Sequence, residues 1–234
     1  MLSLIKIFLI AVWTFICSIF AIIFIVFDRS FKLYFGLSPV YSGGILKISQ
    51  VKVQKSGMEN FEHDKPYIFV SNHSSQFDIP VLQYSIPNKM GMIFKKELAK
   101  IPFFGWQLKW GPYVMIDRKD FESALKSIEE AKEKISKIGM SVVVFAEGTR
   151  SKTGEVQPFK RGAFYLASRS GYPIVPVSIS HSNKIMPKGG FKIKGGQIKV
   201  HFDKPIPTNH LTNKKDELEL MDKVRSIIIK NMEK

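Results

Sequence analysis

The longest apolar stretch of the chain lies near its amino terminus. Residues 7–27 read IFLIAVWTFICSIFAIIFIVF and carry no charged side chain. Only Thr14, Cys17 and Ser18 interrupt the stretch with weak polarity. As an α-helix it would be about 31 Å long, close to the thickness of the bilayer hydrocarbon. We therefore expect residues 7–27 to form a helix that lies in or on a membrane.

Two other interpretations of this stretch are a cleaved signal peptide and a helix of the protein core. A signal peptide is disfavoured because its apolar region is usually about 7 to 15 residues long and is followed by small residues, whereas residues 28–31 read DRSF. A core helix is disfavoured because Lys6 on one side, and Arg29 and Lys32 on the other, are placed as headgroup anchors. Apolar and aromatic residues continue to Gly36, so a second, interfacial helix is open, as are spanning and one-leaflet insertion.

Beyond residue 42 short apolar runs alternate with amphipathic stretches. Gly43-Gly44 is expected to break the chain, and the alternation of apolar and polar residues over 45–53 predicts a half-buried strand. Residues 121–138 place apolar side chains at three- and four-residue steps, which predicts an amphipathic helix ending at Gly139. Further strands are predicted at 67–70, 142–145, 174–179 and 198–202, with helices at 162–170 and in the last segment, where Leu218, Met221, Val224 and Ile228 form the apolar face.

This order of elements predicts an α/β fold with a mixed, largely parallel central sheet covered by helices, after an N-terminal membrane helix or helix pair. A length of 234 residues suits one compact unit. We expect a membrane-anchoring segment at residues 1–42 and one folded domain at residues 43–234.

Composition and charge restrict the partners and the chemistry. Lys plus Arg number 35 and Asp plus Glu 20, a net charge of +15, which calls for an anionic partner. The single cysteine, Cys17, excludes an internal disulfide framework and a multi-thiolate zinc site. The histidines other than His73 are scattered without the spacing of metal ligands, so no metal is predicted. Basic stretches with interleaved aromatic residues are absent, which disfavours nucleic acid as the partner.

A polar cluster follows the strand predicted at 67–70 and reads NHSSQFD from Asn72 to Asp78. On a regular helix a spacing of five rotates the second side chain by about 140°, so a turn must bring His73 and Asp78 together. An aspartate bonded to one imidazole nitrogen fixes the tautomer and leaves the other nitrogen to take a proton from a hydroxyl. The pair therefore predicts a general base, with a surface histidine beside a capping aspartate as the alternative.

Cationic and glycine-containing segments follow three other strands. Glu147, Gly148, Thr149 and Arg150 come directly after the strand at 142–145. Arginine can bind a phosphate with two hydrogen bonds, glycine lets backbone N–H groups approach it, and threonine can donate another bond. This segment is a candidate phosphate site, with a polar turn as the alternative. Two further candidate cations are Arg118 and Lys95.

Four blocks of the chain match the motifs of a known family in order and spacing. Residues 72–78 read N-H-x-x-x-x-D, Arg118 ends a block similar to G-x-x-F-I-D-R, and residues 145–151 are similar to F-P-E-G-T-R-S. Residues 172–177 stand as the fourth block. The chain thereby resembles the glycerolipid acyltransferases over about residues 65–180, and most closely the 1-acylglycerol-3-phosphate (lysophosphatidic acid) O-acyltransferases. Three departures concern the acceptor pocket: Ala146 for Pro, Pro112 for Gly and Met115 for Phe.

The resemblance implies that residues 43–234 are an acyltransferase domain. It implies His73 as the base, Asp78 as its orienting partner, and Arg118 with Glu147–Arg150 as the binding site for the glycerol phosphate, which Lys95 would extend. The implied reaction moves a fatty acyl group from an acyl thioester to the free hydroxyl of 1-acylglycerol 3-phosphate and gives phosphatidic acid. It needs no cofactor, and the donor is either acyl-CoA or acyl carrier protein.

Two alternatives to this activity stay open. The acceptor could be glycerol 3-phosphate or another lysolipid, or the chain could be a non-enzymatic basic module that binds lipid. For either we expect an anionic membrane surface as a partner, because basic residues near a cytoplasmic leaflet are attracted by its acidic lipids. The expected location is a bacterial inner membrane, with the catalytic domain on the cytoplasmic face.

Overall fold

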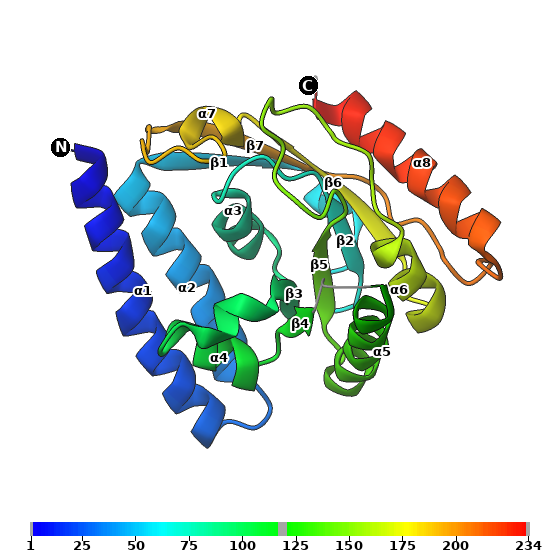
Figure 1. Ribbon diagram of the computed structural model, residues 1–234, viewed down its shortest axis with the longest axis horizontal. Helices are drawn as coiled ribbons and strands as arrows, with labels where there is room; N and C mark the ends of the chain where they lie inside the picture. Colours follow the sequence, from blue (N-terminus) through cyan, green and yellow to red (C-terminus); the bar gives the residue numbers. More distant parts are fainter. Residues whose placement is uncertain (1, 117–120, 233–234) are drawn as a thin grey trace.

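A mixed sheet forms the centre of the protein, whose computed structural model describes residues 2–116 and 121–232 (Figure 1). The strands in those ranges are β1 (Val51–Ser56), β2 (Ile68–Ser71), β3 (Met90–Lys95), β4 (Val114–Ile116), β5 (Ser141–Phe145), β6 (Ile174–Ser180) and β7 (Gly196–Phe202). They lie in the order β1-β7-β6-β2-β5-β3-β4, and all neighbours are parallel except β6 and β7. The structure confirms the predicted α/β fold with a mixed, largely parallel sheet.

Helices cover both faces of this sheet. They are α1 (Leu2–Phe27), α2 (Lys32–Ser49), α3 (Asp78–Ser85), α4 (Phe104–Trp110), α5 (Phe121–Ile138), α6 (Gly162–Ser170), α7 (Ser182–Ile185) and α8 (Lys214–Met232), with short 3₁₀ turns η1 (Met58–Asn60) and η2 (Lys96–Lys100). Helices α2 and α3 lie on one side of the sheet, and α5, α6 and α8 on the other (Figure 1). Helix α1 packs along the outside of α2 and also contacts α4.

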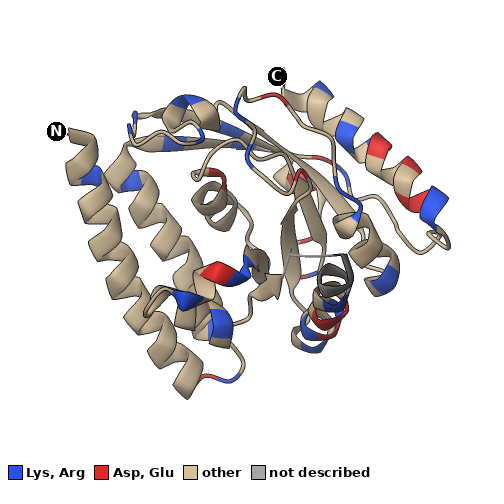
Figure 2. Ribbon diagram, viewed as in Figure 1, with Lys and Arg blue, Asp and Glu red and all other residues tan. Residues whose placement is uncertain are grey.

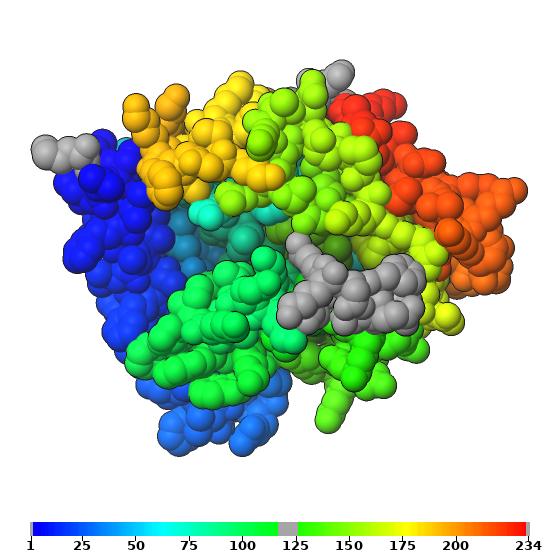
Figure 3. Space-filling view, in the orientation of Figure 1, coloured from blue at the N-terminus to red at the C-terminus, as the bar shows by residue number. Residues whose placement is uncertain are grey.

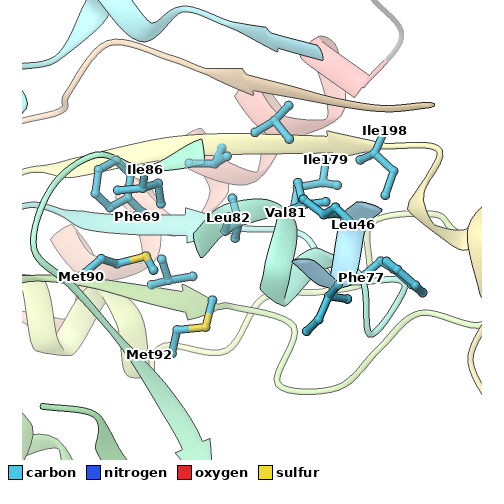
Figure 4. Close-up of a cluster of buried hydrophobic side chains, with 14 of the residues drawn as sticks. Leu46, Phe69, Phe77, Val81, Leu82, Ile86, Met90, Met92, Ile179 and Ile198 are labelled. Carbon is cyan, nitrogen blue, oxygen red and sulfur yellow. The ribbon is translucent and has the colours of Figure 1, made fainter. Parts of the chain in front are cut away.

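Alternate side chains of the central strands enter two separate apolar clusters. Phe69 points to the cluster on the α2 and α3 side, which also contains Leu46 and Val81 (Figure 4). Its neighbour Ile68 belongs to the opposite cluster, with Ile135 of α5. Successive side chains of a strand point to opposite faces, so each central strand contributes to both clusters. The sheet is thus buried on both faces, as expected for parallel strands.

Most elements lie where the hydrophobic pattern predicts them. The strands predicted at 67–70, 142–145, 174–179 and 198–202 are β2, β5, β6 and β7, and the helices predicted at 121–138 and 162–170 are α5 and α6. The apolar face predicted for the last helix is partly wrong. Leu218 is 37% exposed, whereas Leu220, Val224 and Ile228 are buried. Their four-residue spacing turns these three side chains, in place of Leu218, toward the sheet.

The strand predicted over residues 45–53 is wrong for its first half. Helix α2 continues through Gly43 and Gly44 to Ser49, and β1 begins only at Val51. Gly44 serves close packing: a Cβ atom built there would lie 2.3 Å from Nε1 of Trp13 in α1. That indole donates a hydrogen bond of 2.9 Å to the carbonyl of Tyr41. Small residues let two helices approach in this way, and the expected boundary between residues 42 and 43 falls inside α2.

Helix α1 carries one large apolar face that the protein does not cover. Among the described helices it is the only one long and apolar enough to cross a membrane, and 22% of its most apolar window is buried. Figure 2 shows α1 and α2 almost free of charge, in contrast to α5 and α8. Lys6 is not the headgroup anchor predicted: it is 5% exposed, and its Nζ donates to the Ser49 carbonyl. Lys6 instead caps the carboxyl end of α2, where a cation is favourable.

Candidate active site

The candidate residues come together at the carboxyl edge of the sheet. Strands β2 and β5 are parallel neighbours in which Ser71 pairs with Phe145, so the segments that follow them start side by side. Strand β3 is the other parallel neighbour of β5 and ends at Lys95. His73 and Glu147 therefore lie next to each other, although they are 74 positions apart in the sequence. This edge is where α/β folds usually carry their sites.

His73 and Asp78 make the contact that the sequence predicts. The Nδ1 atom of His73 lies 2.8 Å from Oδ2 of Asp78, which is fully buried at the start of α3. The same oxygen accepts the backbone N–H groups of Ser74 at 2.8 Å and Ser75 at 2.9 Å. These bonds fold residues 74–77 into the turn that a five-residue spacing requires. The carboxylate thereby fixes which imidazole nitrogen is used in the contact and leaves Nε2 for chemistry.

The imidazole is also held by an aromatic ring. It stacks on Phe145 with ring centroids 3.9 Å apart and an angle of 15° between the planes. Its side chain is 14% exposed and lines the cavity described below. This contact was not predicted from the sequence, although the pairing of β2 with β5 brings the residues after Ser71 beside Phe145. The stack and the Asp78 bond together fix the plane of the ring.

Neighbouring segments fix the backbone around His73. The side-chain amide of Asn72 donates to the Ile179 carbonyl at 2.9 Å and accepts the Ile179 N–H at 2.9 Å. The side-chain amide thus takes the place of a backbone hydrogen-bonding partner for β6 at the point where β2 ends. On the other side, the Ser151 N–H donates to the His73 carbonyl at 2.7 Å. The backbone of the loop that carries His73 is therefore held by β6 on one side and by the segment after β5 on the other.

Glu147 links the two loops of the site through its carboxylate. It is 3% exposed, and Oε1 accepts the His73 N–H at 2.7 Å while Oε2 accepts the Gln157 N–H at 3.2 Å. Burial raises the pKa of Glu147 to about 7, although the hydrogen bonds from the backbone of His73 and Gln157 lower it. Because both oxygens accept backbone N–H groups, the geometry favours a positioning role for Glu147 over the substrate contact that the resemblance implies.

The glycine-containing loop lines the same cavity as the imidazole. Gly148 has a φ of 70°, a left-handed conformation that favours glycine. Gly148, Thr149 and Arg150 line the cavity, as does Lys95. Lys188, which the sequence does not single out, donates to Oγ1 of Thr149 at 3.0 Å and to the Arg150 carbonyl at 2.8 Å. Every predicted site residue except Arg118 is thus in or beside one site, and Arg118 lies outside the described residues.

A deep cavity of about 400 Å³ extends from His73 into the layer of helices. Its wall comes from α1, α2, α3, β3 and α4, and it includes Cys17, Ala21, Leu37, Tyr41 and Leu108. Figure 3 shows a hollow between the atoms of residues near 100 and those of residues near 160 to 190, with teal atoms at its floor. From the sequence, residues 1–42 are expected only as a membrane anchor, so the part that α1 and α2 take in the cavity wall was not predicted. No local pattern distinguishes a cavity wall from a lipid-facing surface.

The arrangement suits transfer to the hydroxyl of an amphipathic, anionic molecule. An oriented imidazole can take a proton, nearby cations can bind an anionic head, and the apolar cavity can accept a long tail. Among the residues that the structure describes, no group of three or more His, Cys, Asp or Glu side chains could hold a metal ion.

Comparison with known proteins gives consistent matches. The family model named Acyltransferase matches residues 52–180. The 1-acyl-sn-glycerol-3-phosphate acyltransferase of Saccharomyces cerevisiae is 38% identical over 181 residues, covering 76% of this chain and 58% of that protein. The alpha form from Homo sapiens is 34% identical over 175 residues, covering 75% and 62%. The chain thus spans less than two thirds of the length of either relative.

A solved structure matches over nearly the full length of both chains. The crystal structure of PlsC, the 1-acyl-sn-glycerophosphate (LPA) acyltransferase from Thermotoga maritima, superposes with a TM-score of 0.80 at 26% identity. The match covers 100% of this chain and 97% of that one. It therefore includes α1 and α2 as well as the sheet.

Proposed function

We propose, from the premise that this chain belongs to the acyltransferase family, that it transfers a fatty acyl group from a thioester to the free hydroxyl of 1-acylglycerol 3-phosphate. Membership confirms the family that the four sequence blocks predict. The observation that carries the proposal is the 2.8 Å contact of His73 Nδ1 with Asp78 at the mouth of an apolar cavity. The relatives that it resembles carry the same activity in their names.

The reaction that this geometry supports is direct transfer. Nε2 of His73 takes the proton of the acceptor hydroxyl, and the oxygen attacks the carbonyl carbon of the thioester. The C–O bond forms, the C–S bond breaks, and the imidazolium returns its proton to the departing thiolate. Asp78 stabilises the imidazolium between these steps. The acceptor hydroxyl is itself the nucleophile, so the reaction needs no acyl-enzyme and no cofactor.

The charged groups at the mouth divide between the acceptor and the donor. We assign the acceptor phosphate to Arg150, Thr149 and the backbone of Gly148, which border the cavity beside His73. Lys95 lies on the β3 side of the cavity and extends the positive charge there. The donor is acyl-CoA or acyl carrier protein, both anionic, and its acyl chain would occupy the apolar cavity between α1 and α4.

We also propose that the protein works at a membrane surface, with the domain on the side of the acidic cytoplasmic leaflet. Helix α1 exposes apolar side chains along its length, including Leu4, Phe8 and Phe20. Its opposite face lines the cavity with Cys17 and Ala21. Lipid cannot surround a helix that packs lengthwise on the domain, so the geometry favours insertion of α1 into one leaflet over spanning.

The experiment that tests this function uses purified protein in lipid vesicles with defined substrates. Acyl-CoA and acyl carrier protein donors are each combined with lysophosphatidate, glycerol 3-phosphate or lysophosphatidylcholine, and products are read by mass spectrometry. The proposal predicts phosphatidate from lysophosphatidate as the preferred product. A preference for glycerol 3-phosphate or for the choline lipid would contradict lysophosphatidate as the acceptor and identify the preferred compound in its place. Absence of transfer with every pair would leave a lipid-binding module as the function.

A further inference from the structure

The segment between β6 and β7 contains an exposed phenylalanine that the reaction does not use. Phe191 is 79% exposed, more than any other large apolar side chain described outside α1. Gly189 and Gly190 precede it, and Gly189 has a φ of 82°. Leaving a phenylalanine ring in water costs free energy that even partial burial would recover. An exposed ring at a loop tip therefore points to a partner.

This loop is attached to the first turn of α1. The Ile193 N–H donates to Oγ of Ser3 at 3.2 Å. The first two turns of α1 expose Leu2, Leu4 and Phe8 at 65%, 69% and 66%. Figure 1 shows the loop beside the start of α1, and Figure 3 shows its orange atoms near the blue ones. Phe191 is thus exposed two positions from the backbone bond that joins the loop to the amino-terminal turn of α1, where apolar side chains are also exposed.

Lysines flank the exposed ring on both sides. Lys192 and Lys194 are exposed, and Lys188 is half-buried. Figure 2 shows several basic positions in this part of the molecule. An aromatic ring between lysines suits the headgroup level of a bilayer that contains acidic lipid, where the ring lies at the interface and the cations meet the negative surface. An acidic protein would use the lysines but would leave the apolar face of α1 uncovered.

We propose that residues 187–194 form a second membrane contact, in which Phe191 inserts at the headgroup level of an acidic leaflet beside the first turns of α1. The membrane setting of this inference rests on the proposed function. The same segment reaches the active site: Lys188 bonds Thr149 and the Arg150 carbonyl, and Oγ of Ser75 donates to the Met186 carbonyl at 2.7 Å. Contact with the bilayer would therefore hold the loop of Gly148, Thr149 and Arg150 at the surface where a lysolipid headgroup lies.

The direct test measures whether the ring position enters lipid. Phe191→Cys in the full chain is labelled with an environment-sensitive fluorophore and reconstituted in phosphatidylcholine vesicles with phosphatidylglycerol and brominated acyl chains. Leu218→Cys on α8, an exposed site away from α1, is the matched control, and unsubstituted protein corrects for label on buried Cys17. We expect quenching at position 191 and none at 218. Equal and weak quenching at both positions would overturn the proposal.

Charge is tested in the same assay. Replacing Lys192 and Lys194 with serine should lower the quenchable fraction at position 191 only when phosphatidylglycerol is present, because each lysine near an acidic surface changes partition about five-fold. No change would overturn the electrostatic part. A raised KM for acyl carrier protein donors with unchanged quenching would instead assign the lysines to a protein partner.

A kinetic measurement separates this contact from the proposed function. Phe191→Ser should raise the KM for lysophosphatidate in vesicles about five-fold and leave kcat and the KM for a monomeric short-chain acceptor unchanged. An equal rise in KM for the vesicle-bound and the monomeric acceptor would overturn the membrane role of Phe191. Quenching requires no turnover, so the quenching assay tests the membrane contact even if the unsubstituted protein transfers no acyl group. Absence of transfer would contradict only the proposed function.

Discussion

The two ends of the active-site cavity are built in different ways. At the mouth, His73 is positioned by hydrogen bonds to Asp78 and to the loop that follows the adjacent strand β5, at distances of 2.7 to 2.8 Å. At the inner end, the wall comes from side chains of five elements, and Ala21 of α1 and Leu108 of α4 are typical. Hydrogen bonds fix direction, whereas apolar packing fixes volume. The rate of acyl transfer and the preference for acyl-chain length should therefore respond to different substitutions.

The largest expected effect is at the mouth. Asp78→Asn keeps an oxygen near His73 and removes the negative charge that stabilises the imidazolium. We expect kcat to fall between about 10²- and 10⁴-fold, with little change in the KM of either substrate. Steady-state kinetics in vesicles measure this, and a circular dichroism spectrum controls for folding. A fall of less than about three-fold would contradict the role of Asp78.

The next effect concerns the buried bridge between the loops. The pKa of Glu147 is about 7 in the folded protein, against an ordinary value of 4.5. The folded state therefore holds a proton that the unfolded chain releases, and the free energy of unfolding falls as pH rises between these values. The total change is on the order of 3 kcal/mol. Glu147→Gln should flatten this profile in denaturant unfolding at pH 5, 6 and 7, and parallel profiles would contradict it.

A smaller effect is expected for the phosphate contact. Arg150→Ala should raise the KM for lysophosphatidate roughly 10- to 100-fold and change kcat little, because a hydrogen bond to a charged group contributes about 1.5 to 3 kcal/mol. Lys152→Ala, at a neighbouring exposed cation, is the matched control. If Arg150→Ala lowers kcat and leaves KM as it was, the arginine acts on the reacting atoms instead.

The smallest effect belongs to the inner end. Ala21→Leu narrows the cavity without touching the loops, so the ratio of kcat/KM for a C16 donor to that for a C8 donor should fall roughly ten-fold. Ile16→Leu on the exposed side of α1 provides a control of similar chemistry. A loss that is equal for both donors would show that α1 acts on the reaction, which would remove the distinction between the two ends.

The same difference decides what could be predicted from the sequence. His73 and Asp78 are five positions apart, Glu147 to Arg150 are consecutive, and each group follows a predicted strand, so spacing marked both as candidates. Their membership of one site was implied by the resemblance to the glycerolipid acyltransferases. The cavity wall could not be predicted, because Ala21, Leu37 and Leu108 meet only after the chain folds. Helix α2 was misread at residues 45–49, since the pattern of alternation there is outweighed by packing of Gly44 against α1.

Lys6 and Leu218 were misread for a related reason. A lysine at the edge of an apolar stretch is typical of a headgroup anchor, but the side chain of Lys6 reaches the end of α2 at Ser49. The apolar residues of α8 are compatible with more than one buried face, and packing against the sheet buries the face that includes Leu220. In each case a contact distant in sequence decides the outcome.

Whether His73 is the base is tested by comparing the unsubstituted protein with His73→Ala in the same vesicles. Acyl-CoA and lysophosphatidate are supplied, phosphatidate is followed by mass spectrometry, and vesicle sedimentation reports membrane binding. We expect the variant to bind vesicles as the parent does and to form no phosphatidate above the rate without protein. Phosphatidate formation by the variant at a rate near that of the parent would contradict the assignment of His73 as the base.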